Sequence, residues 1–296
     1  MRGYLIVFLI LVSVIMGRAA TKRALLIGIS DYPAYSESVD ATWSPIHGAN
    51  DVQIIGKTLK AQGFKISTLT NSNATASKIR KALKKIRTEV RAGDILYLHF
   101  SCHGQPVEDL NGDEKDGWDE AIVPYDAQKI YRKGIYKGEN HILDDELNNY
   151  LKAIRTKVGP QGFVYVIIDA CHAGSSYRGD DEEDSVVIRG TNSGFSKSNK
   201  PFAPRMNEQS KRSKIKIEKS VSMANICILE ACRSYEKNRE ILEKGKYYGS
   251  LTYYVNKTLQ TIQLGKNVSW TEKVYNNLRK DVRLQQLQNP VIETSL

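Results

Sequence analysis

Short runs of entirely apolar residues alternate with amphipathic segments along most of this 296-residue chain. The run "FVYVIIDA" (163–170) is an example, because its only polar residue is Asp169, next to its end. A strand that is apolar at every position has to be buried on both of its faces. Amphipathic helices between such strands provide that cover. The pattern therefore predicts an α/β/α sandwich, in which a mostly parallel sheet is covered by helices on both faces.

Five strands and five helices are expected from this pattern. In the segment 75–93, for example, Ile79, Leu83, Ile86 and Val90 recur at helical spacing, with Lys and Arg on the opposite face. The expected strands are 22–30, 64–70, 93–101, 163–170 and 224–232. The expected helices are 48–63, 75–93, 143–159, 248–262 and 269–283.

Polar clusters follow three of these strands, at 101–104, 169–174 and 230–233. In open parallel sheets the chemistry lies at the carboxyl ends of the strands. If strands 93–101 and 163–170 are neighbours, His103 and Cys171 face the same crevice. A cysteine and a histidine that are distant in sequence but close in space are typical of a cysteine nucleophile and its base.

The alternative is that Cys171 is a small buried apolar residue and His103 a loop residue with ordinary partners. The paired placement at two strand ends favours the catalytic interpretation. Gly104 adds to it, because a glycine after the histidine permits close substrate approach and supplies an N–H to an oxyanion. His172 is adjacent to Cys171, but neighbouring side chains at a strand end usually point apart.

Several blocks carry a resemblance to a known family. "FSCHG" (100–104) and "IIDACHAG" (167–174), separated by "NGDEKDGWDE" (111–120), resemble the signature blocks of caspase-like cysteine peptidases, and most closely those of metacaspases. "HGANDV" (47–52) and "GSLTYYVNKTLQ" (249–260) resemble two further metacaspase blocks. Several blocks in the right order are more specific than any one of them. The resemblance implies a caspase fold and a cysteine endopeptidase.

The resemblance also implies roles for particular residues. Cys171 would be the nucleophile and His103 the general acid and base, with the N–H groups of Gly104 and Cys171 as the oxyanion hole. Asp51 and Asp169 would line the pocket for the residue before the cut. Two carboxylates in a narrow pocket favour Lys or Arg, which predicts cleavage after these residues. The alternative for Asp51 is that it caps or buttresses its helix. Cys102 stands where the family usually has glycine, and its role is open.

Metacaspases are typically activated by calcium, and the resemblance implies Ca²⁺ ligands at Asp119, Asp144 and Asp145. A third ligand-bearing stretch is unclear, with Asp180 and Asp181 nearby. The alternative is that Asp144 and Asp145 only favour a helix N-terminus. Asp109, Asn111, Asp113 and Glu120 have the spacing of an EF-hand loop, but Glu114 stands where that loop has glycine, so an EF-hand is not expected.

The segment 178–221 is predicted to be a flexible, charged processing insert. It separates a large part (21–177) from a small part (222–296) of one peptidase domain, and it is too long for an ordinary loop. Basic residues dominate it without aromatic interleaving or a nucleic-acid motif, so no nucleic-acid partner is expected. An enzyme that cuts after basic residues can cut this insert. The candidate self-cleavage sites are Arg189, Lys197, Lys211, Arg212, Lys214 and Lys216.

The first 20 residues read as a signal peptide. Arg2 precedes an apolar run from Tyr4 to Met16, and Gly17 and Ala19 could flank a cleavage site. This predicts a secreted or periplasmic protein without a stable membrane span, and an uncleaved anchor is the alternative. The four cysteines have the spacing of neither a disulfide framework nor a zinc site.

Two rival functions remain at this level. One is a gingipain- or clostripain-like cysteine peptidase, against which the two acidic stretches argue. The other is a catalytically silent caspase-fold interaction module, against which the presence of both His103 and Cys171 argues. The expected partners are peptide or protein substrates with Lys or Arg before the cut, and the chain is expected to be a monomer.

Overall fold

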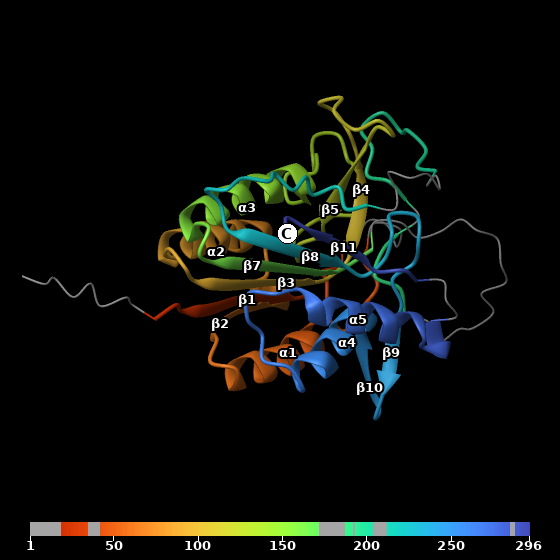
Figure 1. The fold of residues 1–296 in the computed structure, drawn as a ribbon. Helices are drawn as coiled ribbons and strands as arrows, with labels where there is room; N and C mark the ends of the chain where they lie inside the picture. Colours follow the sequence, from red (N-terminus) through yellow and green to blue (C-terminus); the bar gives the residue numbers. More distant parts are fainter. Residues whose placement is uncertain (1–18, 35–41, 172–186, 192, 204–211, 285–287) are drawn as a thin grey trace, which may run out of the picture.

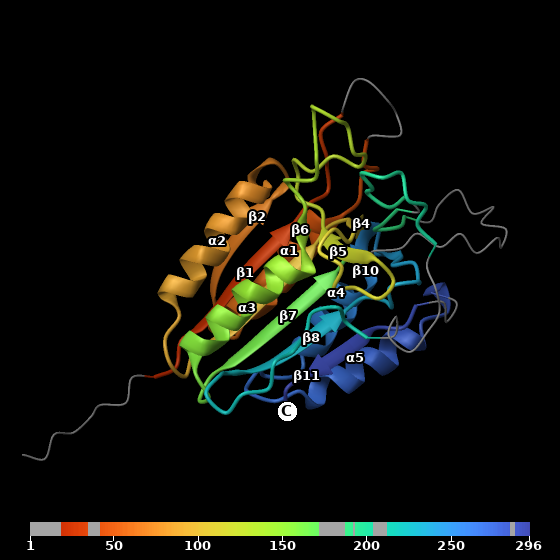
Figure 2. The same ribbon diagram turned by 90° about the horizontal axis from the view of Figure 1, so that it is seen from above.

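A six-stranded sheet forms the centre of the protein (Figures 1 and 2). The structure, a computed structural model, describes residues 19–34, 42–171, 187–191, 193–203, 212–284 and 288–296. The strand order is β11-β8-β7-β3-β1-β2, and only β11 is antiparallel to its neighbour. The strands are β1 (Lys22–Gly28), β2 (Lys65–Thr70), β3 (Ile95–Ser101), β7 (Phe163–Asp169), β8 (Asn225–Glu230) and β11 (Val291–Thr294).

Helices cover both faces of this sheet, as predicted. Figure 1 shows α2 and α3 on one face and α1, α4 and α5 on the other. Alternate residues of each central strand pack into the two layers: Leu98 and Val166 face α2 and α3, whereas Tyr97 and Tyr165 face the opposite side. The helices are α1 (Gly48–Ala61), α2 (Ala76–Glu89), α3 (Asp144–Val158), α4 (Ser250–Leu259) and α5 (Ser269–Arg279).

Two small sheets, which the sequence pattern did not predict, adjoin the carboxyl ends of the central strands. One holds β4 (Gly104–Glu108), β5 (Trp118–Ile122) and β6 (Ile142–Leu143), and the other is a hairpin of β9 (Glu240–Glu243) and β10 (Lys246–Gly249). β4 begins immediately after His103, so the polar stretch after the third strand turns into a second sheet rather than a loop.

β3 and β7 are adjacent parallel strands, and Ser101 pairs with Asp169 at their carboxyl ends. His103 and Cys171 each follow that pair by two residues, which brings both to one edge of the sheet.

The predicted signal peptide falls within residues 1–20, of which 1–18 lie outside the described residues. Among the residues that the structure describes, no helix is long and apolar enough to cross a membrane.

Candidate active site

His103 is fully buried and held from three sides. Its ring lies 4.9 Å from that of Trp43 and 5.2 Å from that of Tyr32, and the Tyr32 hydroxyl accepts its backbone N–H. Nε2 lies 2.8 Å from the carbonyl oxygen of Ser44. A carbonyl only accepts hydrogen bonds, so Nε2 carries the proton. Burial lowers the pKa of His103 to about 4, which leaves Nδ1 unprotonated and able to act as a base.

Cys171 is also fully buried. Its Sγ donates to the carbonyl oxygen of Glu236 at 2.8 Å. Cys232 lies beside it, because the Cys232 thiol contacts the same carbonyl at 3.5 Å. The thiol of Cys171 is therefore turned towards the loop after β8.

The backbone N–H groups of Cys171 and of Gly104, the residue after His103, converge on one carbonyl group, that of Arg189. The N–H of Cys171 donates to this oxygen at 2.8 Å, and the N–H of Gly104 lies at 3.4 Å. These are the two N–H groups expected to form an oxyanion hole, and they converge on one peptide carbonyl. The next residue, Gly190, lies so close that an added Cβ would be 3.0 Å from Cβ of Cys171. The Arg189–Gly190 peptide bond thus lies against the proposed nucleophile.

The side chain of Arg189 fills the predicted pocket and is fully buried there. Its Nη1 lies 2.8 Å from Oδ2 of Asp51 and 3.6 Å from Oδ1 of Asp169. It also donates to Oγ of Ser101 at 2.6 Å. Burial alone would lower the pKa of Arg189, but the carboxylates around it outweigh burial and raise it, so the guanidinium stays charged.

A third carboxylate, Glu240, completes the pocket. Its Oε1 accepts hydrogen bonds from Nε of Arg189 at 2.9 Å and from Nη2 at 2.7 Å. His47 holds this carboxylate through its backbone N–H to Oε1 and through Nδ1, which lies 2.5 Å from Oε2. Sequence reasoning missed Glu240, since "NREILE" matches none of the recognised blocks and only the β9–β10 hairpin brings it to the pocket.

Asp51 and Asp169 are held by polar groups from several elements. Asp51 accepts from Oγ of Ser101 and from the N–H of Gly249. Asp169 accepts from the N–H and the hydroxyl of Thr252, both at 2.7 Å, at the start of α4. A side chain at Gly249 would collide with Asp169 Oδ2 at 2.2 Å, so this position requires glycine. The partners that the Asp51 carboxylate accepts from, Ser101 and Gly249, lie outside its own helix α1, which disfavours the alternative role as a cap.

Burial raises the pKa of Asp51 to about 7. Arg189 opposes this shift, whereas Asp169 and Glu240 add to it. The pocket thus concentrates more negative charge than one guanidinium neutralises, which strongly favours a cation over a neutral or acidic side chain.

The residues before Arg189 pair with the loop that follows β8. Ile188 and Arg239 form an antiparallel bridge, Arg189 N–H donates to Asn238 O, and Glu240 N–H donates to Val187 O. An extended peptide that adds to an existing strand edge is a common mode of peptide recognition. The sequence predicted a solvated insert. Composition alone cannot show that Arg189 of this insert is buried among three carboxylates.

The other self-cleavage candidates lie in different surroundings. Lys197 and Arg212 are exposed, and Lys211 lies outside the described residues. The side chain of Lys214 is almost buried, and its Nζ donates to Asp116 and to the Trp118 carbonyl. Lys216 is exposed and pairs with Asp113 at 3.0 Å. Of the candidates that the structure describes, Arg189 has its carbonyl between the N–H groups of Gly104 and Cys171.

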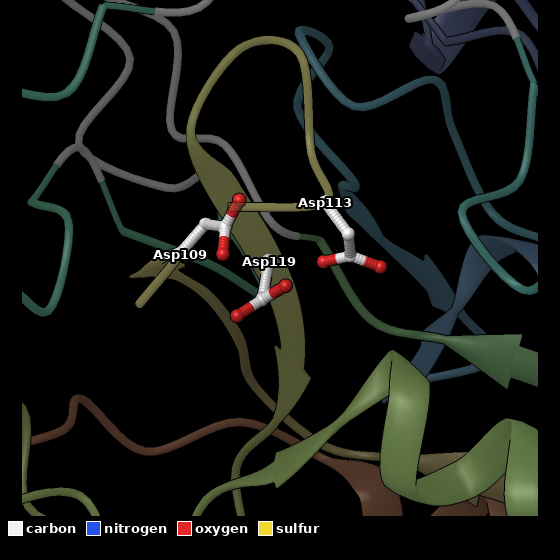
Figure 3. A group of neighbouring side chains, drawn as sticks. All are labelled: Asp109, Asp113 and Asp119. Atoms are coloured by element: carbon white, nitrogen blue, oxygen red, sulfur yellow. The ribbon is translucent and has the colours of Figure 1, made fainter. Parts of the chain in front are cut away.

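Three aspartates in the acidic stretch converge. Asp109, Asp113 and Asp119 each have a carboxylate oxygen within 4.8 Å of the others, and Figure 3 shows them around a common space beside β5. Asp119 is almost buried, and its Oδ1 has no hydrogen-bond partner among the described residues. Clustered carboxylate oxygens suit Ca²⁺, so these residues fit such an ion.

Only one of the three predicted calcium ligands, Asp119, belongs to this cluster. Asp145 lies at its margin, where its Oδ2 accepts from Nδ2 of Asn111 at 3.2 Å. Asp144 accepts the N–H of Glu120 and lines a small cavity with Glu120 and Glu230. Burial raises the pKa of Asp144 to about 8, and neighbouring Glu120 adds to the shift. Asp180 and Asp181 lie outside the described residues.

Cys102 packs into the hydrophobic layer between the sheet and α2 and α3. Burial raises the pKa of its thiol to about 12, so it stays protonated. All four cysteines are free thiols. Cys102 is therefore a core residue in this structure.

Comparison with known proteins identifies the family. The model of the caspase domain, peptidase family C14, matches residues 21–296. The chain belongs to the caspase-domain family. Its curated relatives include Metacaspase-3 of Arabidopsis thaliana, 31% identical over 58% of this chain and 49% of the relative. Metacaspase-7 of the same plant is 28% identical over 76% of this chain and 50% of the relative.

A fungal relative, Metacaspase-1B of Aspergillus fumigatus, is 36% identical over 34% of this chain and 22% of its own length. The chain thus spans at most about half the length of these relatives. A solved structure, protein GSU0716 from Geobacter sulfurreducens, has a TM-score of 0.60 at 21% identity, over 93% of each chain. That likeness bears on the fold alone. Among caspase-domain proteins, this chain is similar to metacaspases.

Proposed function

We propose that this caspase-domain protein is a cysteine endopeptidase that cuts after Arg, and less efficiently after Lys, and that it first cuts itself between Arg189 and Gly190. The observation that carries the proposal is the position of Arg189, whose side chain meets three carboxylates while its carbonyl meets the N–H groups of Gly104 and Cys171. A catalytically silent module would have no need for such a fit between a peptide carbonyl and the N–H groups beside a cysteine and a histidine.

The chemistry follows from these groups. Nδ1 of His103 takes the proton of the Cys171 thiol, and Sγ forms a bond to the arginyl carbonyl carbon. The N–H groups of Gly104 and Cys171 stabilise the developing oxyanion. The C–N bond breaks as His103 returns the proton to the leaving amine. Water, deprotonated by His103, then hydrolyses the thioester and restores the thiol.

One rearrangement has to precede attack. In the described state the Cys171 thiol donates to the Glu236 carbonyl. It has to leave this acceptor and turn towards the Arg189 carbonyl before a bond can form. The described state therefore corresponds to an uncut precursor with its own insert bound in the substrate position.

Glu240 supports a preference for Arg over Lys. Both of its hydrogen bonds to Arg189 come from Nε and Nη2, and a lysine side chain has no equivalent of this fork. The metacaspase relatives favour this function over the gingipain- or clostripain-like alternative.

Calcium stimulation is the second part of the proposal. Asp109, Asp113 and Asp119 would hold Ca²⁺, with Asp145 near them. When bound, the ion would neutralise these carboxylates. Lys216 of the insert already pairs with Asp113 and Glu114. A cation at Asp113 would compete with that contact and loosen this part of the insert.

Two measurements test the proposal. Fluorogenic peptides that end in Arg, Lys or Asp before the reporter should be cut fastest after Arg, more slowly after Lys and not at all after Asp. Equal turnover of Arg and Asp peptides would contradict the assignment of Asp51 and Asp169 to the pocket for the residue before the cut.

For the ion, calorimetric titration of Ca²⁺ into the Cys171→Ala protein should show binding that Asp119→Asn weakens. Asp31→Asn, at an exposed position away from the cluster, is the control. Unchanged affinity in Asp119→Asn would exclude this cluster as the site.

A further inference from the structure

The insert continues beyond the Arg189–Gly190 bond along β4, the strand that begins directly after His103. The N–H of Phe195 donates to Pro106 O at 2.8 Å, and Glu108 N–H donates to Phe195 O at 2.9 Å. Phe195 and Val107 form a parallel bridge. β4 pairs with β5 on its other side, so the insert occupies the remaining edge of this small sheet. Figure 1 shows β4 and β5 beside the carboxyl end of the central sheet.

Phe195 lies in an aromatic pocket. Its side chain is 3% exposed, and its ring centroid lies 4.8 Å from that of His141, 5.6 Å from that of Tyr136 and 6.0 Å from that of Tyr131. Gly138, at φ 99°, closes the pocket, since an added Cβ would be 2.9 Å from the Phe195 ring. A cavity of about 260 Å³ adjoins the ring between Leu110 and Tyr131.

Buried hydrogen bonds hold the pocket in place. The Tyr136 hydroxyl lies 3.0 Å from Nδ1 of His141, and Nε2 of His141 lies 2.9 Å from Oε1 of Gln105. Gln105 is fully buried, and its Nε2 donates to the carbonyl oxygen of Ser193 at 3.0 Å. One connected network thus fixes the aromatic walls and also binds the backbone two residues before Phe195. This arrangement is a preorganised peptide site.

The geometry points to a substrate-binding site on the leaving-group side of the cut. We infer that the pocket of Tyr131, Tyr136, Gly138 and His141 binds an aromatic side chain six residues after the cleaved bond, with the peptide backbone added to the edge of β4. In the precursor Phe195 is that side chain. After self-cleavage the same pocket selects extended protein substrates that carry an aromatic residue at this position. This inference rests on the proposed peptidase function.

The main test uses the self-cleaved enzyme and quenched fluorogenic peptides with the sequence of residues 187–198. The parent peptide has Phe at the sixth position after Arg, a second has Ala there, and a third has Phe moved to the fourth position. The parent should have a KM at least about fivefold lower than both others, with similar kcat, because burying one aromatic ring contributes binding alone. Equal KM values for the three peptides would overturn the inference.

Variants of the pocket sharpen this test. Tyr131→Ala removes one half-buried wall of the pocket and should reduce the difference in KM between the parent and the Ala peptide. Phe195→Ala vacates the pocket of its own chain and should enlarge that difference. Phe202→Ala, which removes another aromatic side chain of the insert, packed on Trp118 instead, is the matched control and should leave the difference unchanged.

The outcomes separate this inference from the proposed function. If short peptides with Arg before the cut and the three long peptides are all cut equally well, the peptidase stands and the aromatic pocket only anchors the precursor, which overturns the inference. If no Arg peptide is cut at all, the peptidase itself is refuted and the inference falls with it.

Discussion

Two parts of the same insert each bring a basic side chain to a group of carboxylates, yet they differ in what they can do. Arg189 is fully buried among Asp51, Asp169 and Glu240, and its backbone carbonyl lies between two N–H groups of the active site. Lys216 is 57% exposed and pairs with Asp113 and Glu114 on the acidic stretch. Charge complementarity is common to both, and burial and backbone position distinguish the Arg189 contact, the proposed cleavage site, from the surface contact of Lys216.

This difference has an energetic side. Breaking a buried ion pair leaves charges without solvent, whereas an exposed pair exchanges its partner for water. The Arg189 contact should therefore control both stability and processing, and the Lys216 contact should only modulate the binding of a competing cation.

The largest expected effect concerns processing. Arg189→Gln should lower the rate of self-cleavage between residues 189 and 190 by on the order of 10⁴-fold. A site that holds a guanidinium through ion pairs and hydrogen bonds rejects a side chain that cannot form them. Lys216→Gln should not change the rate of self-cleavage after Arg189. N-terminal sequencing of the small fragment checks this, and a fragment that still begins at Gly190 in Arg189→Gln would contradict it.

The second prediction concerns stability in the uncleavable Cys171→Ala background. Arg189→Gln should lower the free energy of unfolding by about 3–5 kcal/mol, since it leaves buried carboxylates unpaired. Lys216→Gln should change it by less than about 1 kcal/mol. Urea unfolding at neutral pH measures both values, and similar losses in the two variants would erase the distinction between the two contacts.

The third prediction concerns Glu240. Glu240→Gln should reduce the ratio of kcat/KM for Arg over Lys peptides by about tenfold, because it weakens the bonds that only a guanidinium makes. Glu243→Gln, on the same strand but outside the pocket, is the control. An unchanged ratio in Glu240→Gln would assign the preference to Asp51 and Asp169 alone.

The fourth prediction concerns pH. Burial raises the pKa of Asp51 to about 7 while Arg189, which lowers it, is in place. When Arg189 leaves, that lowering is lost, so the pKa in the vacant pocket is higher still. An ionised Asp51 binds Arg better, so kcat/KM should rise with pH through neutrality. A pH profile that is flat from 6 to 8 would contradict the role of Asp51.

The smallest expected effect is on calcium. Lys216→Gln removes a competitor for Asp113 and should tighten Ca²⁺ binding about two- to threefold. Calorimetry in the Cys171→Ala background measures it, with the exposed Lys219→Gln as control. Weaker binding in Lys216→Gln would show that the lysine does not compete with the ion.

The sequence by itself determined five of the six central strands, the helices that cover the sheet and the likeness to metacaspases, but not the antiparallel edge strand β11. Apolar runs and helical periodicity are local signals, and the blocks around His103 and Cys171 are contiguous in sequence. Periodicity places both residues at the carboxyl ends of parallel strands, whereas the structure shows that these two strands, β3 and β7, are neighbours.

Only the tertiary structure decided which side chains meet at and beside the carboxyl edge of the central sheet. Glu240 lies on a hairpin with no motif, and Phe195 lies in a segment whose composition suggested a solvated insert. Asp109 and Asp113 converge with Asp119, whereas Asp144 turns towards Glu120 and Glu230. Each of these contacts joins residues far apart in the chain or depends on the direction of a side chain. Local patterns carry no information on either, because burial and partner choice are set only when the whole chain packs.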